Sequence, residues 1–322
     1  MRSVTFVSRL TLDISGDVAQ HGLCLGDVTG DGDHELVVGT DGGDLLVFKG
    51  AGGQVWRRGQ DMGFITAVGM GDLLNIGHTV VVVVSGCGWL NILDLHNDTD
   101  METMEGEIKP IHTQRIPANV KDVIIGDING DGSTELVISL TDRVVRTYKW
   151  LAASSTSSES ASASQGRLVS INKWEFASQI GTVTLNYESD GSPALLVAQP
   201  GGAFMKLKCD KSKEDEVTEN TTSVGEDHDD EEAEVLSKMS VEYEPLGVNR
   251  RRNPNVSAEI LGGFHTAGWS PGDTGGTRYA IVTLDGTIML VDNCDKPPME
   301  SIMWNLQVSA ASRVWCQVVS PG

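Results

Sequence analysis

The stretch Gly-Asp-Val-Thr-Gly-Asp-Gly-Asp-His-Glu-Leu-Val-Val-Gly at residues 26–39 decides the fold of this chain. It recurs without a gap at residues 126–139 as Gly-Asp-Ile-Asn-Gly-Asp-Gly-Ser-Thr-Glu-Leu-Val-Ile-Ser. Each copy is a carboxylate-rich, glycine-hinged loop that can turn its oxygens toward a hard cation or toward its own amides. The apolar run that follows is short and β-branched, which predicts a strand buried on both faces. The recurrence itself indicates a repeat architecture.

A further copy between these two shows which residues the fold needs. Residues 71–93 align with residues 26–48 without a gap and keep the first aspartate, the glycines and the apolar strand. The other ligand-type positions of the loop have become apolar, as Leu74, Ile76 and Val80. We therefore predict a unit of the same architecture that has lost any cation site.

Weaker copies follow along the chain. Residues 190–198 lead into a predicted strand at 203–207, and residues 276–284 lead into one at 287–291. A sixth unit starts at residues 304–308. Each unit supplies several short strands joined by tight turns, and the chain has 37 glycines but only 5% aromatic residues. This pattern predicts an all-β fold, a β-propeller of about five blades and the start of a sixth.

Three segments interrupt the repeats within this single incomplete propeller, which we assign to residues 1–322. Residues 97–110 are predicted to form a loop, and the Ser/Ala-rich residues 152–164 a flexible loop. Residues 210–254 are acidic and poor in apolar residues, so they are predicted to be a disordered insertion.

Composition narrows the class of protein. A net charge of −21 argues against nucleic acid as a partner. The longest apolar run, residues 80–84, is too short for direct membrane insertion, and the N-terminus lacks a signal-peptide core. An odd number of cysteines, five, without a CxxC pair predicts free, mostly buried thiols. We therefore expect a cytoplasmic protein.

The Gly-Asp-x-x-Gly-Asp-Gly-x-x-Glu-Leu-Val units resemble FG-GAP repeats, the blade unit of the integrin α-subunit β-propeller. The chain is also similar, over about residues 1–310, to the family of integrin-α FG-GAP repeat-containing protein 2. This closer resemblance rests on stretches at residues 22–39, 116–119, 141–146, 168–174 and 283–287.

The resemblance implies a closed, seven-bladed propeller, so we expect this chain to be a C-terminally truncated form, destabilised by its open sheet edges. It also implies a non-enzymatic scaffold or adaptor subunit of the KICSTOR complex. Such a subunit helps to recruit a GTPase-activating complex to the lysosomal membrane surface and to restrain mTOR signalling when nutrients are scarce. The implied partners are the other KICSTOR-type subunits and that GTPase-activating complex.

In integrin repeats the acidic loop positions bind calcium, and the resemblance carries this role to two loops here. The candidate ligands are Asp127, Asn129, Asp131, Ser133 (through its carbonyl) and Glu135 in one loop, and Asp27, Thr29, Asp31, Asp33 (through its carbonyl) and Glu35 in the other. The competing interpretation is that these carboxylates accept hydrogen bonds from loop amides and cap the turn. No required cofactor is expected.

No catalytic pattern appears in the sequence, which has no HExxH, Gly-x-Ser-x-Gly, Walker or Rossmann motif. One alternative function is an integrin-like, calcium-dependent propeller that binds an extracellular ligand. The missing signal peptide and the odd number of cysteines count against it. Another is a propeller enzyme such as a polysaccharide lyase, which would need a convergent set of acids and bases. Tryptophans at strand positions are expected to pack between blades: Trp56, Trp89, Trp150, Trp174 and Trp304.

Overall fold

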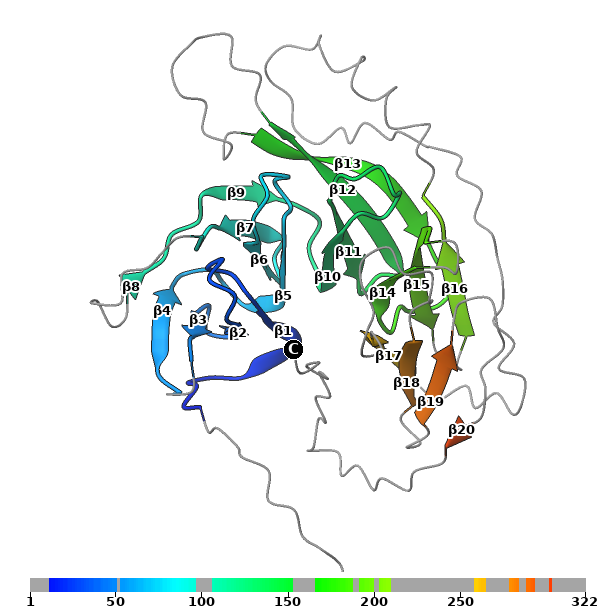
Figure 1. The fold of residues 1–322 in the computed structure, drawn as a ribbon, viewed down its shortest axis with the longest axis horizontal. Coiled ribbons are helices and arrows are strands. Elements are labelled where there is room, and N and C mark those ends of the chain that lie inside the picture. The colour runs from blue at the N-terminus through cyan, green and yellow to red at the C-terminus, as the bar shows by residue number, and fades with distance from the viewer. Residues whose placement is uncertain are drawn as a thin grey trace, which may run out of the picture. The chain divides into compact units, whose positions relative to one another are not determined.

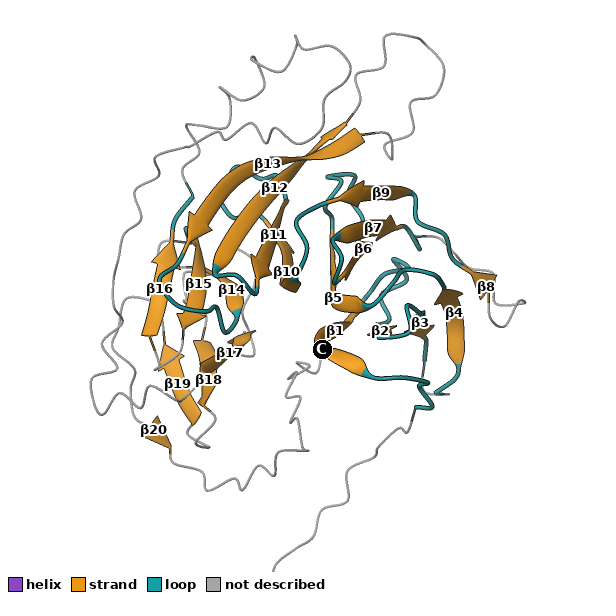
Figure 2. Cartoon of the chain, turned by 180° about the vertical axis from the view of Figure 1, so that it is seen from behind, coloured by secondary structure: helices purple, strands orange, loops and turns teal. Residues whose placement is uncertain are grey.

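Strands and their connecting loops make up the described part of the chain. The computed structural model describes residues 12–50, 53–96, 106–152, 166–187, 191–199, 203–209, 258–264, 278–283, 288–292 and 301–302. Within these ranges it has twenty strands and no helix (Figure 1 and Figure 2). The prediction of an all-β chain is confirmed.

The first two repeats each form a four-stranded antiparallel meander. The first contains β1 (Val18–Gly26), β2 (Glu35–Thr40), β3 (Leu45–Phe48) and β4 (Val55–Gly59). The second contains β5 (Ile65–Gly71), β6 (Val80–Ser85), β7 (Trp89–Leu93) and β9 (His112–Arg115). A parallel bridge between His21 and Ala67 joins β1 to β5, and the short strand β8 (Gly106–Glu107) runs parallel to β4.

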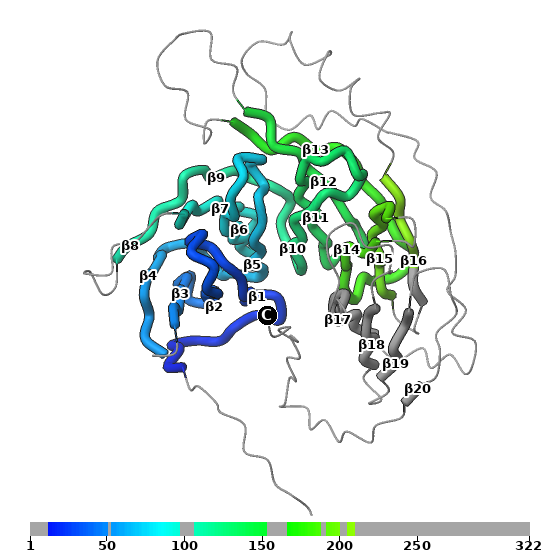
Figure 3. The backbone as a smooth tube through the Cα atoms, in the orientation of Figure 1, coloured from blue at the N-terminus to red at the C-terminus, as the bar shows by residue number. Residues whose placement is uncertain are grey.

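Three further sheets follow in the same strand order. One contains β10 (Val120–Gly126), β11 (Glu135–Leu140), β12 (Val144–Ala152) and β13 (Gly166–Glu175). The next contains β14 (Val183–Tyr187), β15 (Pro193–Gln199) and β16 (Ala203–Leu207). The last contains β17 (Ala258–Phe264), β18 (Arg278–Thr283), β19 (Ile288–Asp292) and β20 (Ser301–Ile302). The coloured tube in Figure 3 traces the chain from β10 to β15 through the first two of these sheets. The chain divides into two compact units, Met1–Ile125 with Trp150–Leu168 and Gly126–Lys149 with Val169–Gly322.

Strand β2 is buried on both faces, as the apolar run after the first acidic loop predicts. Val37 packs in a cluster with residues of β3, β5 and β6, while its neighbour Val38 packs in a second cluster with Leu46 and Phe48. Successive side chains of a strand point to opposite faces, so both faces need apolar residues. The same reason explains β6, in which every residue is buried.

Most segments that the sequence marks as interruptions lie outside the described residues. This holds for residues 97–105, 153–165 and 210–254, and also for the start of the predicted sixth unit at 304–308. The structure describes residues 106–110 of the first of these loops, where it places strand β8 at residues 106–107 and no strand at 108–110. Residue 152 is the last residue of β12.

Two expectations about side chains need correction. Trp150 and Trp174 are buried, but Trp89 is 44% exposed because it opens β7 at the strand end, directly after a turn. The three described cysteines (Cys24, Cys87 and Cys209) are free. The expectation of mostly buried thiols is wrong for these three, because Cys24 and Cys209 are half-buried and Cys87 is exposed in the turn between β6 and β7.

Candidate functional site

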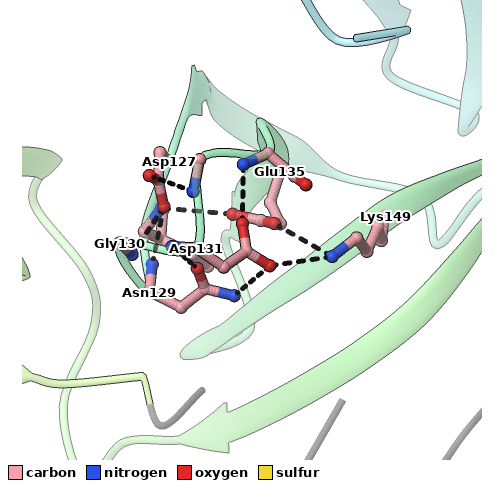
Figure 4. A network of polar contacts seen from close by, with 9 residues as sticks. Asp127, Asn129, Gly130, Asp131, Glu135 and Lys149 are labelled. Atoms are coloured by element: carbon pink, nitrogen blue, oxygen red, sulfur yellow. Dashed lines mark hydrogen bonds and ion pairs between the residues drawn. The ribbon is translucent and has the colours of Figure 1, made fainter. Parts of the chain in front are cut away.

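The acidic loop between β10 and β11 is folded around the carboxylate of Asp127 (Figure 4). Asp127 Oδ1 accepts hydrogen bonds from the amides of Gly130 (2.6 Å) and Asn129 (3.3 Å), and Oδ2 accepts one from the amide of Gly132 (2.9 Å). Gly130 and Gly132 have φ values of 74° and 89°, a left-handed backbone that glycine adopts most readily. The first aspartate of the loop therefore caps a tight turn that needs its glycines.

The next polar residues continue this pattern of side chain to backbone bonds. Asn129 Oδ1 accepts from the Asp131 amide at 2.8 Å, and Asp131 Oδ1 accepts from the Ser133 amide at 2.6 Å. Glu135, the first residue of β11, is fully buried, and its Oε2 accepts from the Ile128 amide at 3.1 Å. Each of these side chains stabilises the loop that carries it.

Lys149 of β12 brings a positive charge to the same oxygens. Its Nζ donates to Asp131 Oδ2 at 3.0 Å and lies 3.8 Å from Glu135 Oε1. Asn129 Nδ2 donates to the same Asp131 oxygen at 3.2 Å. Figure 4 shows the lysine pointing from its strand toward both carboxylates.

The first loop repeats this arrangement with tighter contacts to its lysine. Lys49 Nζ lies 2.5 Å from Asp31 Oδ2 and 3.3 Å from Glu35 Oε1, and it donates to Thr29 Oγ1 at 3.1 Å. Nζ also lies 5.0 Å from the centroid of the Trp56 ring, a cation–π contact. Thus one ammonium group contacts three of the five predicted calcium ligands.

The other contacts of the first loop also match those of the later one. Asp27 accepts from the amides of Gly30 (2.7 Å) and Gly32 (2.9 Å), and Asp31 Oδ1 accepts from the Asp33 amide at 2.9 Å. Glu35 is fully buried and accepts from the Val28 amide at 3.1 Å. The two loops therefore share one hydrogen-bonding plan.

Lys49 and the acidic residues of the first loop shift each other's pKa values. The hydrogen bond from Lys49 is the main cause that lowers the pKa of Asp31 to about 2. Burial opposes the charge of Lys49, but its hydrogen bond to Asp31 and the charge of Glu35 outweigh burial and raise the Lys49 pKa. Both groups are thus ionised at neutral pH.

The degenerate loop after β5 tests whether the first aspartate needs a cation. Asp72 accepts from the amides of Ile76 and Gly77, both at 2.8 Å, in a loop whose other ligand-type positions are apolar. An aspartate at the first position of the loop therefore caps the turn even where the other candidate calcium ligands are missing. Nearby, His78 Nε2 lies 3.1 Å from Asp94 Oδ2, and the rings of His78 and His96 stack at 4.2 Å.

The structure thus brings each predicted five-residue set together on one loop. Calcium takes about six to eight oxygen ligands. In both loops, however, the carboxylates of the first two aspartates accept hydrogen bonds from loop amides, and the second also pairs with a lysine. Each glutamate accepts one amide through Oε2, while its buried Oε1 accepts no hydrogen bond and lies 3.3 Å (Glu35) or 3.8 Å (Glu135) from the lysine. Among the described residues, no group of three or more His, Cys, Asp or Glu is placed to hold a metal ion. Calcium binding at these loops stays a prediction.

The sequence interpretation missed Lys49 and Lys149. A signal was present, because each lysine follows the glutamate of its loop at the same spacing, Glu35 to Lys49 and Glu135 to Lys149.

The described part of the chain has no helix long and apolar enough to cross a membrane.

Comparisons with known proteins identify the repeats and the family. The FG-GAP repeat model matches residues 20–56, and the model of integrin-alpha FG-GAP repeat-containing protein 2 matches residues 49–312. The β-propeller prediction is therefore supported by the repeat that the blades contain.

Two curated relatives are named KICSTOR complex protein ITFG2. The Mus musculus protein is 36% identical over 314 residues, which are 96% of this chain and 68% of that protein. The Bos taurus protein is 34% identical over 316 residues, which are 96% of this chain and 56% of that protein. The chain thus spans a little over half of the length of the bovine relative.

Similar solved structures are distant in sequence. BBS1N in a complex with ARL6DN, soaked with mercury, has a TM-score of 0.49 and 14% identity, with 85% of this chain and 66% of that chain covered. The WD40 β-propeller domain of Doa1 has a TM-score of 0.47 and 11% identity, with 90% and 71% covered. The family match over residues 49–312 and the identity to both curated relatives establish that this chain belongs to the integrin-alpha FG-GAP repeat-containing protein 2 family.

Proposed function

We propose that this chain is a non-enzymatic scaffold subunit of a KICSTOR-like complex. The observation that carries the proposal is the 36% identity to a mouse KICSTOR complex protein over 96% of this chain. The acidic loops support it, because their carboxylates contact loop amides and lysines and so act within the fold. A scaffold needs such repeated, rigid sheets to present loops and strand ends to partners.

The finer role that we propose follows from the family. The subunit helps to recruit a GTPase-activating complex to the lysosomal membrane surface and restrains mTOR signalling when nutrients are scarce. Its direct partners are other subunits of the scaffold, and the protein itself performs no reaction. Family membership and the names of the relatives support this role.

An exposed aromatic pair is the first surface to test for partner contact. Phe64 is 53% exposed and Trp89 is 44% exposed, on either side of the turn at residues 86–88. The guanidinium of Arg115 lies 5.1 Å from the centroid of the Trp89 ring. Trp and Arg are enriched among the residues that dominate binding energy in interfaces. We propose that a KICSTOR-type subunit covers this pair.

Affinity purification from cells, followed by mass spectrometry, tests the proposed function. The tagged full chain is expected to recover KICSTOR-type subunits and the GTPase-activating complex, and lysosomal fractions should contain it. Trp89→Ala should reduce this recovery, whereas Lys109→Ala, at a side chain 77% exposed, should not. Calcium-dependent recovery of cell-surface ligands in place of scaffold subunits would support the integrin-like alternative and refute the proposal.

A further inference from the structure

The two acidic loops carry a cation of their own. We propose that the ammonium groups of Lys49 and Lys149 permanently take the place of the calcium ion that the acidic residues predict, so that both loops fold without metal. The proposal concerns these loops alone and does not depend on the partners of the chain.

Contact geometry is the first support. The Lys49 ammonium contacts Asp31, Glu35 and Thr29 within 3.3 Å, which are three of the residues that the calcium prediction assigns to one ion. The Lys149 side chain lies at the equivalent place, 3.0 Å from Asp131. A divalent cation among these oxygens would meet the positive charge of the lysine at close range. Lysine and calcium therefore exclude each other.

Strand register is the second support. Glu135 and Lys149 are cross-strand partners in the β11–β12 ladder. The pair Leu36 and Phe48 in the β2–β3 ladder places Glu35 opposite Lys49 one residue farther on. Residues directly opposite each other in antiparallel strands have neighbouring side chains. The sheet itself thus holds each lysine beside the glutamate of its own loop.

The other repeats show that the glutamate occurs only where a lysine faces it. In the second repeat, the pair Val81 and Leu93 places Val80 opposite Asp94, so neither member of the charged pair is present. In the fourth, Ala194 takes the place of the glutamate, and the pair Leu195 and Leu207 places it opposite Lys208, so the lysine occurs there without the glutamate. In these four repeats the glutamate therefore occurs only opposite a lysine, as expected if the buried carboxylate depends on the lysine.

Burial explains this dependence. The side chains of Glu35 and Glu135 are both 0% exposed, and a buried carboxylate without a compensating charge is costly. Each glutamate accepts one loop amide through Oε2, and each faces the lysine with Oε1. Loss of the lysine would leave a buried negative charge with room for another cation beside it. Such a variant should then acquire a calcium response that the natural chain lacks.

Thermal melts of the purified full chain in calcium and in chelator test the proposal. The natural chain should have the same Tm in 1 mM calcium and in excess EGTA. Lys49→Met should lower the Tm in EGTA by roughly 5–10 °C, and calcium should restore part of that loss. The control Lys109→Met, at an exposed lysine that pairs with an exposed glutamate at 3.8 Å, should melt like the natural chain in both buffers.

A double variant keeps the test decisive if Lys49→Met alone does not fold. Glu35→Gln combined with Lys49→Met removes both charges, so it should recover most of the Tm lost by Lys49→Met and show no calcium response. A saturable, calcium-dependent rise in the Tm of the natural chain would overturn the proposal. A double variant that melts as low as, or lower than, Lys49→Met would overturn it too.

Discussion

The aspartate that opens each acidic loop provides a sharp test, because the same residue occurs in a loop that has lost its other acids. Asp27 accepts two loop amides, from Gly30 and Gly32, and Asp72 accepts two in the degenerate loop, from Ile76 and Gly77. If the aspartate is a turn cap, Asp27→Ala and Asp72→Ala should destabilise the chain to a similar extent.

The magnitude follows from the number of bonds. A hydrogen bond to a charged group contributes about 1.5–3 kcal/mol, and partial exposure of the aspartate reduces this, so two bonds give about 1–3 kcal/mol. For a chain of this length that corresponds to a fall in Tm of roughly 2–5 °C. Differential scanning fluorimetry with and without calcium measures it. The reasoning is refuted if Asp27→Ala costs several times more than Asp72→Ala in calcium but the same in EGTA, because the aspartate would then be a metal ligand.

Other predictions concern single residues in the first two repeats. Cys87 should react with iodoacetamide at least about tenfold faster than Cys24 at pH 7.5. Cys87 is exposed and its hydrogen bond with a serine lowers its pKa, whereas burial raises the pKa of Cys24. Mass spectrometry of the alkylated peptides measures both rates. Gly43→Ala should lower the Tm, because Gly43 has a φ of 91° and an added Cβ would lie 3.0 Å from a backbone nitrogen. The control Gly42→Ala, whose added Cβ would have its nearest atom at 3.7 Å, should leave the Tm nearly unchanged in the same thermal melt. The pKa of Asp31 is lowered from 3.8 to about 2, so its contribution to stability is complete above about pH 4 and is lost as the pH falls toward 2. Asp31→Asn should therefore make the Tm fall less steeply between pH 4 and pH 2. An unchanged slope of Tm against pH would contradict the ion pair with Lys49.

Most of the fold could be predicted from local sequence patterns. The run that begins at Glu35 is β-branched and follows a glycine-hinged loop, and these two features suffice to place β2 and, by repetition, β6 and β11. Hairpin turns follow from the glycines between the strands. These features depend on neighbours in sequence, which a single chain displays directly.

The site was harder to predict, because it depends on register. Lys49 contacts Glu35 across a hairpin, and the contact becomes visible only when the two strands are aligned residue by residue. A one-residue slip would turn the lysine to the other face of the sheet. The exposure of Trp89 was missed for a similar reason, because a tryptophan at a strand end is covered only if another element packs over it.

Repetition within one chain also separates structural from chemical requirements. Asp72 and Gly77 remain where the acids around them have become apolar, so the turn requires them. Glu35 and Glu135 remain only where a lysine faces them, so the buried carboxylate requires the lysine. The carboxylates of the acidic loops thus support the turns that carry them.

Isothermal titration of calcium into the full chain tests this account most directly. The account predicts no heat beyond that of dilution up to millimolar calcium, since Lys49 and Lys149 already contact carboxylates that a calcium ion would need. The double variant Lys49→Met, Lys149→Met, titrated in parallel, should show measurable binding. A saturable binding isotherm at micromolar calcium for the natural chain would contradict the account.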